Sequence, residues 1–337
     1  MQLSESKRRG GNIGKIAQRL LPWFSQNARD LPWRRTRDPY AIWVSEIMLQ
    51  QTRVAVVVDR WREFMACFPT VFALAAATEQ DVLALWSGLG YYRRARMLHK
   101  AAQAVATAGG AMPTTSAELR KLPGVGSYTA AAVASIACGE RIAVVDGNVE
   151  RVLCRLAGWD AKGGHERKVQ ELAARLVDED RPGDFNEAMM ELGAIVCLPR
   201  NPQCLVCPLA GSCKTRGEHK TAVRIRSVVR EAGCALCLRA GPCVLLEQRP
   251  STISVMPGLW DLPALRDVPN GNARMTVRHA IMNVNYVVRV RDVSEEDLPE
   301  LAATGSERRW VRVNEAMAMA LTGLARKILK RIGKGLG

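Results

Sequence analysis

Apolar residues recur every three to four positions through the first part of the chain, which is the period of an amphipathic helix. This spacing predicts helices over 13–25, from Pro39 onward, and at about 54–67, 71–76, 79–87, 92–108 and 116–121. The helical pattern continues from 143 to 210, and no strand pattern precedes about residue 228. We therefore expect this part to be all-helical.

The pattern changes beyond about residue 228. Residues 243–250 predict a strand and a turn, 286–290 predict a second strand, and a basic amphipathic stretch at about 314–332 predicts a terminal helix. We therefore expect a helical domain over 1–215, a polar and basic linker over 216–228, and a smaller α+β domain over 229–337.

Charge points to a polyanionic partner. The 337 residues carry a formal net charge of +15, and both halves of the chain contribute to it. A distributed positive field favours nucleic acid first and an anionic membrane second; a merely soluble basic protein is the plain alternative. The sequence has neither an apolar run of membrane-spanning length nor the apolar core of a signal peptide. We expect a monomer in a bacterial cytoplasm, associated with the nucleoid.

A glycine turn precedes one candidate acid. Residues 122–126 read Leu-Pro-Gly-Val-Gly and lead into an Ala-rich stretch that favours helix. Gly124 and Gly126 can adopt positive φ and present backbone N–H groups at a helix N-terminus, which is a site for phosphate. An ordinary helix corner is the plain alternative. Asp146 follows an apolar run and precedes Gly147, so it is a candidate functional carboxylate.

A second candidate acid lies inside an apolar helix. Glu46 belongs to the segment Ile-Trp-Val-Ser-Glu-Ile-Met-Leu at 42–49, where burial would raise the pKa of its carboxyl group and suit it to general acid catalysis. A glutamate on the solvent face of the helix is the alternative.

Aromatic and basic residues alternate in two further places. The loop 27–38, which contains Trp33, fits a nucleic-acid surface or a base pocket, or alternatively a surface loop with one buried tryptophan. Tyr91 and Tyr92 end a glycine turn at 88–93 and could wedge into a base stack or cap a helix from the core.

Four cysteines predict a metal centre. Cys197, Cys204, Cys207 and Cys213 have the spacing Cys-x6-Cys-x2-Cys-x5-Cys, which lets four thiolates converge on zinc or on an iron–sulfur cluster without choosing between them. Arg200, Lys214 and Arg216 make the surroundings basic, so we expect this loop to touch the DNA backbone as well. Cys234, Cys237 and Cys243 form a partial echo, which we interpret as one hairpin with small buried residues and not as a second metal site.

These motifs resemble the MutY-type adenine glycosylases, members of the helix–hairpin–helix base-excision glycosylases related to endonuclease III. The resemblance rests on Leu-Pro-Gly-Val-Gly at 122–126, Val-Asp-Gly-Asn-Val at 145–149, Ser-Glu-Ile-Met-Leu-Gln-Gln-Thr at 45–52 and the cysteine spacing, and it covers roughly 15–335. It implies a helix–hairpin–helix near 121–138 and a [4Fe–4S] cluster on the loop 197–213. It also implies a Nudix-like C-terminal domain, marked by Gly-Leu-Trp-Asp-Leu-Pro at 258–263, for lesion recognition. The Nudix hydrolase box is missing.

The resemblance implies removal of adenine mispaired with 8-oxoguanine or guanine in double-stranded DNA. Glu46 would protonate the adenine ring, Asp146 would stabilise the oxocarbenium-like sugar, and Tyr128 and Asn148 would support this pair. The adenine pocket would be lined by Arg29, Leu31, Trp33, Arg34 and Glu187. Gln51 and Tyr91 would fill or wedge the stack, and Gly124 and Gly126 would contact the DNA backbone.

One position departs from the family pattern. Ile281-Met282-Asn283 stands where the family carries Phe-Ser-His to inspect 8-oxoguanine, and only Asn283 retains a comparable hydrogen-bonding group. We therefore expect weaker discrimination between 8-oxoguanine and guanine.

Three alternatives to adenine excision remain. A lyase of the endonuclease III kind needs a Schiff-base lysine where this chain has Tyr128. A thymine-mismatch glycosylase would share the tyrosine and aspartate, although Glu46 and the second domain favour adenine. A non-catalytic damage-binding protein would not need both acids.

Overall fold

The computed structural model describes residues 3–160, 164–217, 228–239, 241–268, 271, 273–281, 284–298, 301 and 307–333, with side chains from residue 15 onward. The chain divides into two compact units, Met1–Ala75 with Lys100–Val223 and Ala76–His99 with Arg224–Gly337. Residues 76–99 thus group with the C-terminal part by their contacts. The domain boundaries at 215 and 229 stay a prediction, and most of the expected linker lies outside the described residues.

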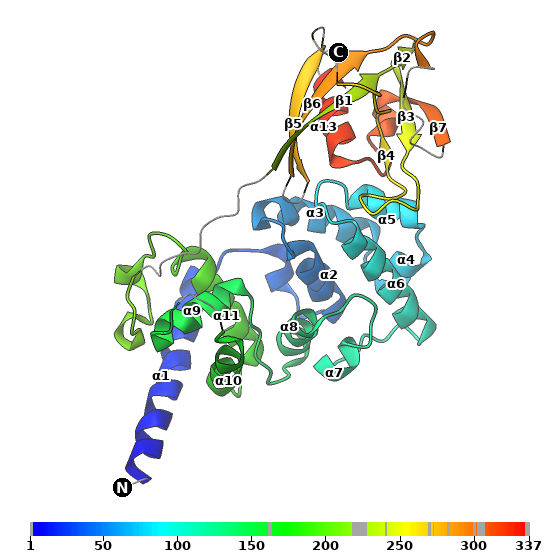
Figure 1. Ribbon diagram of the computed structural model, residues 1–337. Helices are drawn as coiled ribbons and strands as arrows, with labels where there is room; N and C mark the ends of the chain where they lie inside the picture. Colours follow the sequence, from blue (N-terminus) through cyan, green and yellow to red (C-terminus); the bar gives the residue numbers. More distant parts are fainter. Residues whose placement is uncertain are drawn as a thin grey trace. The chain divides into compact units, whose positions relative to one another are not determined.

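The first unit is helical, as expected (Figure 1). It contains α1 (Leu3–Asn27), α2 (Pro39–Leu49), α3 (Val54–Cys67), α4 (Val71–Ala76), α7 (Ser116–Leu119), α8 (Ser127–Cys138), α9 (Gly147–Ala157), α10 (Glu166–Leu176), α11 (Pro182–Ile195) and the short 3-10 turns η1 (Pro32–Arg35), η2 (Cys204–Val206) and η3 (Ala210–Ser212). Helix α6 (Arg93–Thr107) has residues in both units.

Local sequence signals start and end the helices around the site. Asp38 caps α2 by accepting a hydrogen bond from the Tyr40 backbone N–H, with Pro39 in the first turn. Helices α8 and α9 end at Gly139 and Gly158, which both adopt the left-handed conformation that favours glycine. Helix α2 is buried along most of its length and packs against α8, while α11 packs against α1, α8 and α9. The packing of these helices against one another positions the site residues.

The second unit combines α5 (Glu79–Leu85) with two sheets and a C-terminal helix. In one sheet, β1 (Val228–Leu236) pairs parallel to β6 (Val284–Asp292), which pairs antiparallel to β5 (Met275–Ile281). In the other, β3 (Cys243–Gln248) pairs antiparallel with β2 (Leu238–Arg239), β4 (Trp260–Asp261) and β7 (Glu307–Arg312). Helix α13 (Gly323–Gly333) packs its buried face into a core shared with both sheets (Figure 1). The expected α+β architecture is confirmed.

The prediction of one continuous helix at about 314–332 is wrong. The segment forms α12 (Val313–Ala316) and α13, separated by residues 317–322. The Trp260 backbone N–H donates to the Ala320 carbonyl at 2.9 Å, and the Thr322 N–H donates to the Trp260 carbonyl at 2.8 Å. Pairing with β4 therefore uses backbone groups that a continuous helix would need.

The expected hairpin around the second cysteine group is only partly correct. Cys243 lies in β3, which forms a hairpin with β2, whereas Cys234 lies in β1 of the other sheet. Cys234 and Cys237 are buried, and burial raises the pKa of the two thiols to about 12 and about 11. Among the described residues, no helix is long and apolar enough to cross a bilayer.

Candidate active site

A cavity of about 330 Å³ lies within the first unit. This volume is in the range of small-molecule sites. The cavity brings together ten residues that the sequence singled out, namely Arg29, Leu31, Trp33, Arg34, Glu46, Gln51, Tyr128, Asp146, Asn148 and Glu187. Residues far apart in the sequence thus meet in one place.

The Glu46 carboxyl group lies in the wall of this cavity, on the buried helix α2. Its residue is only 6% exposed. Burial raises the pKa of Glu46 to about 7; the Tyr128 hydroxyl opposes the rise as a hydrogen-bond partner, while the charges of Glu187 and Asp146 add to it. Near neutral pH a substantial fraction of Glu46 therefore holds a proton that it can donate.

Asp146 occupies the N-cap of α9. Its Oδ1 accepts a hydrogen bond from the Val149 backbone N–H at 2.7 Å, and its Oδ2 accepts one from Asn148 Nδ2 at 2.9 Å. The positive end of the α9 dipole lies at the same point. The carboxylate is thereby fixed in place and remains half-buried at the cavity.

The Asn148 amide is oriented from behind by Arg151. Arg151 Nη2 donates to Asn148 Oδ1 at 2.9 Å and to the Gly193 carbonyl at 2.8 Å, and its Nε donates to the Cys197 carbonyl at 2.8 Å. The amide nitrogen of Asn148 is then left facing Asp146. These hydrogen bonds connect the start of the cysteine loop to the candidate carboxylate.

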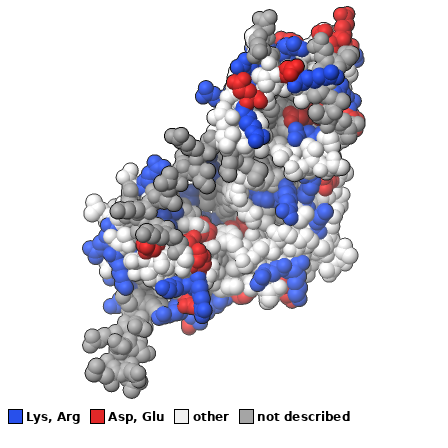
Figure 2. Space-filling model, viewed as in Figure 1, with Lys and Arg blue, Asp and Glu red and all other residues white. Residues whose placement is uncertain are grey.

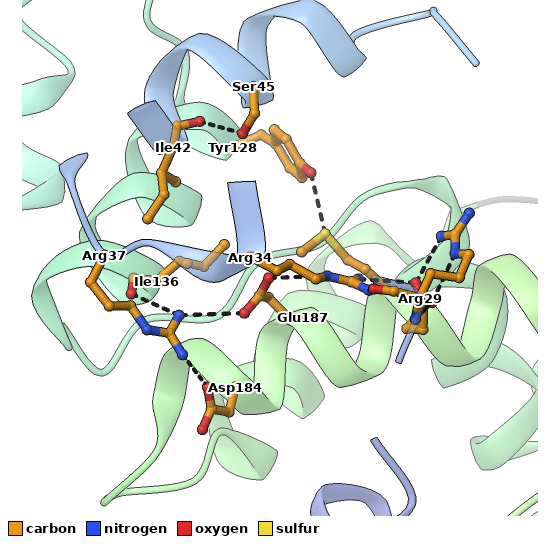
Figure 3. A network of polar contacts seen from close by, with 11 residues as sticks. Arg29, Arg34, Arg37, Ile42, Ser45, Tyr128, Ile136, Asp184 and Glu187 are labelled. Carbon is orange, nitrogen blue, oxygen red and sulfur yellow. Dashed lines mark hydrogen bonds and ion pairs between the residues drawn. The ribbon is translucent and has the colours of Figure 1, made fainter. Parts of the chain in front are cut away.

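Arginines and carboxylates form a network of hydrogen bonds and ion pairs (Figure 3), and Arg34, Glu187 and Glu191 of this network line the cavity. Arg34 Nε pairs with Glu187 at 3.3 Å, and Arg37 pairs with the same carboxylate at 3.4 Å and with Asp184 at 2.6 Å. Burial raises the pKa of Glu187, and the charges of Arg34 and Arg37 oppose that rise. Glu187 is therefore held between two cations at the cavity wall.

Glu191 is a member of this network that the sequence reasoning missed. Its carboxylate accepts hydrogen bonds from the Arg29 backbone N–H at 2.9 Å, from Arg29 Nε at 2.8 Å and Nη2 at 2.7 Å, and from Arg34 Nη2 at 2.9 Å. Burial alone would raise the pKa of Glu191, but the hydrogen bonds from Arg29 and Arg34 outweigh it and hold the pKa at about 2. The spacing of four residues from Glu187, on one face of α11, was the available signal.

The expected pocket and stack residues differ in exposure. Leu31 and Trp33 are buried, and the Trp33 ring meets the Trp61 ring edge-on at 6.1 Å between centroids. Gln51 and Tyr91 are exposed and have φ values of 56° and 47°. Such values are uncommon outside glycine and concentrate at functional sites. Tyr92, by contrast, is buried.

The two glycines of the turn before α8 differ in backbone conformation. Gly124 has a φ of 75°, whereas Gly126 is extended with a φ of −85° and precedes α8 without a side-chain cap. Only Gly124 therefore requires glycine for its backbone. Because the first N–H groups of a helix have no partner within it, the start of α8 keeps the geometry of a phosphate site.

The four cysteines of the loop 197–213 line one small cavity together with Arg155 and Arg216. Arg155 is buried, and its Nη1 donates to Cys197 Sγ at 3.3 Å. Burial and the neighbouring thiols raise the pKa of Cys207. No three His, Cys, Asp or Glu side chains of the described part of the chain are placed to hold one metal ion. Four cysteines that line one cavity can supply the four thiolates of an iron–sulfur centre.

The expected lesion-inspection loop is described only at its first residue. Ile281 ends β5 and lines a cavity of about 460 Å³ within the second unit. Met282 and Asn283 lie outside the described residues. The expectation for this loop stays a prediction.

Comparisons with known proteins give a consistent result. Residues 44–179 match the HhH-GPD superfamily of base excision DNA repair proteins, and residues 197–213 match the iron–sulfur binding domain of endonuclease III. Cys197, Cys204, Cys207 and Cys213 therefore belong to an iron–sulfur binding domain.

Individual relatives cover different shares of the chain. The adenine DNA glycosylase of Rattus norvegicus is 38% identical over 321 residues, which cover 77% of this chain and 62% of that protein. The adenine DNA glycosylase of Homo sapiens is 50% identical over 210 residues, covering 58% of this chain and 38% of that protein. The chain thus spans less than two thirds of the length of these relatives. A solved structure of a thermostable thymine-DNA glycosylase superposes with a TM-score of 0.57 at 31% identity, covering 61% of this chain and 97% of that one.

Proposed function

Because the chain belongs to the HhH-GPD superfamily of base excision DNA repair proteins and, within it, to the MutY-type adenine glycosylases, we propose that it removes adenine mispaired with 8-oxoguanine or guanine. The observation that carries the proposal is the buried Glu46 carboxyl group, with a pKa of about 7, which shares one cavity with the Asp146 carboxylate. An acid that holds a proton beside a fixed anion is the pair that N-glycosidic bond hydrolysis requires.

Glu46 supplies the proton in this proposal. An adenine extruded from the duplex enters the cavity, because its glycosidic bond is inaccessible inside the helix. Glu46 donates its proton to a ring nitrogen of the base, and the bond from that base to the sugar then breaks with a neutral leaving group. Glu187 offers a carboxylate to the exocyclic amino group, which adenine has and guanine lacks at the same ring position. Arg34 and Arg37 keep that carboxylate in place.

Asp146 stabilises the positive charge that develops on the sugar. Asn148 and the Val149 backbone N–H hold both of its oxygens, so little reorganisation is needed as that charge forms. Water then adds to the sugar and loses a proton to solvent, which leaves an abasic site. Tyr128 stands where a lyase would place a Schiff-base lysine, and no lysine is found among the described residues lining the cavity. This favours simple hydrolysis without strand cleavage.

The cysteine loop fits a [4Fe–4S] cluster, held by Cys197, Cys204, Cys207 and Cys213. When bound, the cluster would cross-link four points of this loop and so fix its shape. The loop's own basic residues, Arg200, Lys214 and Arg216, would then face the DNA backbone. The C-terminal α+β part would serve lesion recognition as a Nudix-like domain without a hydrolase box. We further propose that the protein acts as a monomer in a bacterial cytoplasm.

An excision assay separates this function from its alternatives. The native protein is incubated with duplexes containing adenine opposite 8-oxoguanine, adenine opposite guanine, or thymine opposite guanine, with and without a final alkali step. We expect breaks at adenine only, and only after alkali. Breaks without alkali would indicate a lyase, release of thymine would indicate the thymine-mismatch activity, and tight binding without any release would indicate a damage-binding protein.

A further inference from the structure

Tyr91 sits at the tip of a strained turn. Gly88, Gly90 and Tyr91 have φ values of 96°, 70° and 47°. The Tyr91 side chain is 45% exposed, whereas the residues that flank the turn, Ser87 and Tyr92, are 0% and 4% exposed. A non-glycine residue with positive φ costs free energy and persists only where its surroundings enforce it. The contacts of the buried flanking residues, Ser87 and Tyr92, therefore determine how the Tyr91 backbone is held.

Both flanks are held by a segment from the C-terminal end of the chain. The Tyr92 hydroxyl donates to the Leu321 carbonyl at 3.1 Å, and the Ser87 hydroxyl donates to the same carbonyl at 3.4 Å. Arg326 Nε donates to Ser87 Oγ at 2.5 Å. All of these residues belong to the second unit.

The holding segment is itself fixed to the second sheet. Arg326 also donates to the Met317 and Met319 carbonyls at 2.8 and 3.1 Å. Thr322 Oγ1 donates to Asp261 Oδ1 at 2.9 Å, next to the backbone hydrogen bonds between residues 320–322 and Trp260. Because the helix is interrupted between α12 and α13, the Leu321 carbonyl is available to accept hydrogen bonds from the two residues that flank the turn.

The turn is also held by Arg94. Its Nη2 donates to the Leu89 and Gly90 carbonyls at 3.0 and 3.1 Å, and its guanidinium lies over the Tyr91 and Trp86 rings at 5.6 and 5.5 Å. Arg94 therefore holds the turn itself and contacts the Tyr91 ring, while residues 317–326 hold the two residues that flank the turn.

We propose that residues 317–326 position Tyr91 for insertion into the DNA base stack, with Tyr92, Ser87 and Arg326 as the positioning residues. The C-terminal part of the chain then contributes to extrusion of the adenine as well as to reading the opposite base. This inference rests on the proposed function, since Tyr91 has a role only if the protein opens a duplex. An exposed aromatic ring inserts productively only when its backbone is fixed, because a free turn would lose conformational entropy on binding.

The test is a double-mutant cycle between Tyr92→Phe and Tyr91→Ala. Tyr92→Phe removes one hydroxyl group and leaves the ring volume in place. The dissociation constant for a duplex with adenine opposite 8-oxoguanine is measured for the native protein, both single variants and the double variant. We expect Tyr92→Phe to weaken binding about three- to tenfold, the effect of losing a hydrogen bond. In the Tyr91→Ala background the same change should have no further effect.

Tyr40→Phe is the matched control. The Tyr40 hydroxyl is also buried and donates to a backbone carbonyl, that of Phe68, at 2.8 Å. Tyr40→Phe should lower the melting temperature about as much as Tyr92→Phe does, while leaving the dissociation constant for the duplex unchanged. Equal effects of Tyr92→Phe with and without Tyr91, or equal binding by the Tyr92→Phe and Tyr40→Phe variants, would overturn the inference. A native protein that binds the duplex but releases no adenine would instead overturn the proposed function, whatever the cycle shows.

Discussion

Glu46 and Glu191 line the same cavity, and their surroundings shift their pKa values in opposite directions. Burial raises the pKa of Glu46 to about 7, whereas hydrogen bonds from Arg29 and Arg34 overcome burial and hold that of Glu191 at about 2. At neutral pH a substantial fraction of Glu46 is protonated and available as an acid, whereas Glu191 is an anion. Two carboxyl groups with different partners can therefore take different roles in one site.

The pKa of Glu46 predicts how excision depends on pH. Donation requires the protonated form, which predominates below a pKa of about 7 and disappears as the pH rises through it. We expect the single-turnover rate of adenine release to fall about tenfold per pH unit on the alkaline side. Rates measured between about pH 5.5 and 9 on one mismatch duplex give the profile. A rate that stays constant up to pH 9 would rule out Glu46 as the proton donor.

Glu191 predicts a structural effect on the pocket. Glu191→Gln should lower the free energy of unfolding by roughly 2–3 kcal/mol, because Arg29 loses a charged partner while remaining partly solvated. Excision should fall as well, since Arg34 is no longer fixed beside Glu187. Asp184→Asn is the control, because it removes only more exposed ion pairs of Arg37 and Arg181 and should cost about 1 kcal/mol or less. Equal losses in chemical denaturation of the two variants would refute a special role for Glu191.

At the scale of secondary-structure elements, α11 packs so closely against α8 and α9 that two of its glycines have no room for a side chain. A Cβ at Gly193 would lie 2.6 Å from Asn148 Cβ, and a Cβ at Gly183 would lie 2.7 Å from the Ser135 carbonyl oxygen. Both distances are far inside van der Waals contact. Only the first neighbour, however, belongs to the candidate catalytic group.

The two glycines therefore form a matched pair of variants. Gly193→Ala and Gly183→Ala should each cost roughly 1–3 kcal/mol of stability through overpacking. Gly193→Ala should also displace Asn148 from Asp146 and lower single-turnover excision at least tenfold more than Gly183→Ala does. The measurement compares rates per folded protein at a temperature where both variants are native. Equal rates would show that Asn148 does not position Asp146.

The sequence predicted elements that depend on local patterns. The apolar run around Glu46 correctly indicated a buried carboxyl group in α2, and the glycine turn before Ser127 correctly indicated where α8 begins. The break between α12 and α13 was missed, because it depends on backbone pairing with Trp260, some sixty residues away in the chain. Glu191 was missed for the same reason, since its partner Arg29 lies 162 positions earlier.

At the scale of the whole molecule, basic side chains are found on the surfaces of both units (Figure 2). Both units can therefore offer basic side chains for contacts with DNA phosphates, in keeping with the net charge of +15. In the cysteine loop the four thiols come from separate short segments, and no disulfide joins these segments among the described residues. The iron–sulfur centre should accordingly act as a structural clamp.

Iron content tests the identity of this centre. Protein purified without chelators should be yellow-brown and contain about four irons per chain. Cys213→Ser should lower the iron content and the melting temperature together. Cys243→Ser is the control, since Cys243 lies in β3 and outside the loop. A colourless, active protein with one zinc per chain would contradict the assignment.

The most direct test of the central claim is single-turnover excision by Glu46→Gln on a duplex with adenine opposite 8-oxoguanine at neutral pH. The amide has no acidic proton, so the variant should bind the duplex like the native protein and release no adenine. Its fold should be secure, because removing a carboxyl group whose pKa is raised from 4.5 to about 7 should raise the free energy of unfolding by roughly 3 kcal/mol at pH 8 and have little effect near pH 4. Release of adenine by this variant at a rate near that of the native protein would contradict the account.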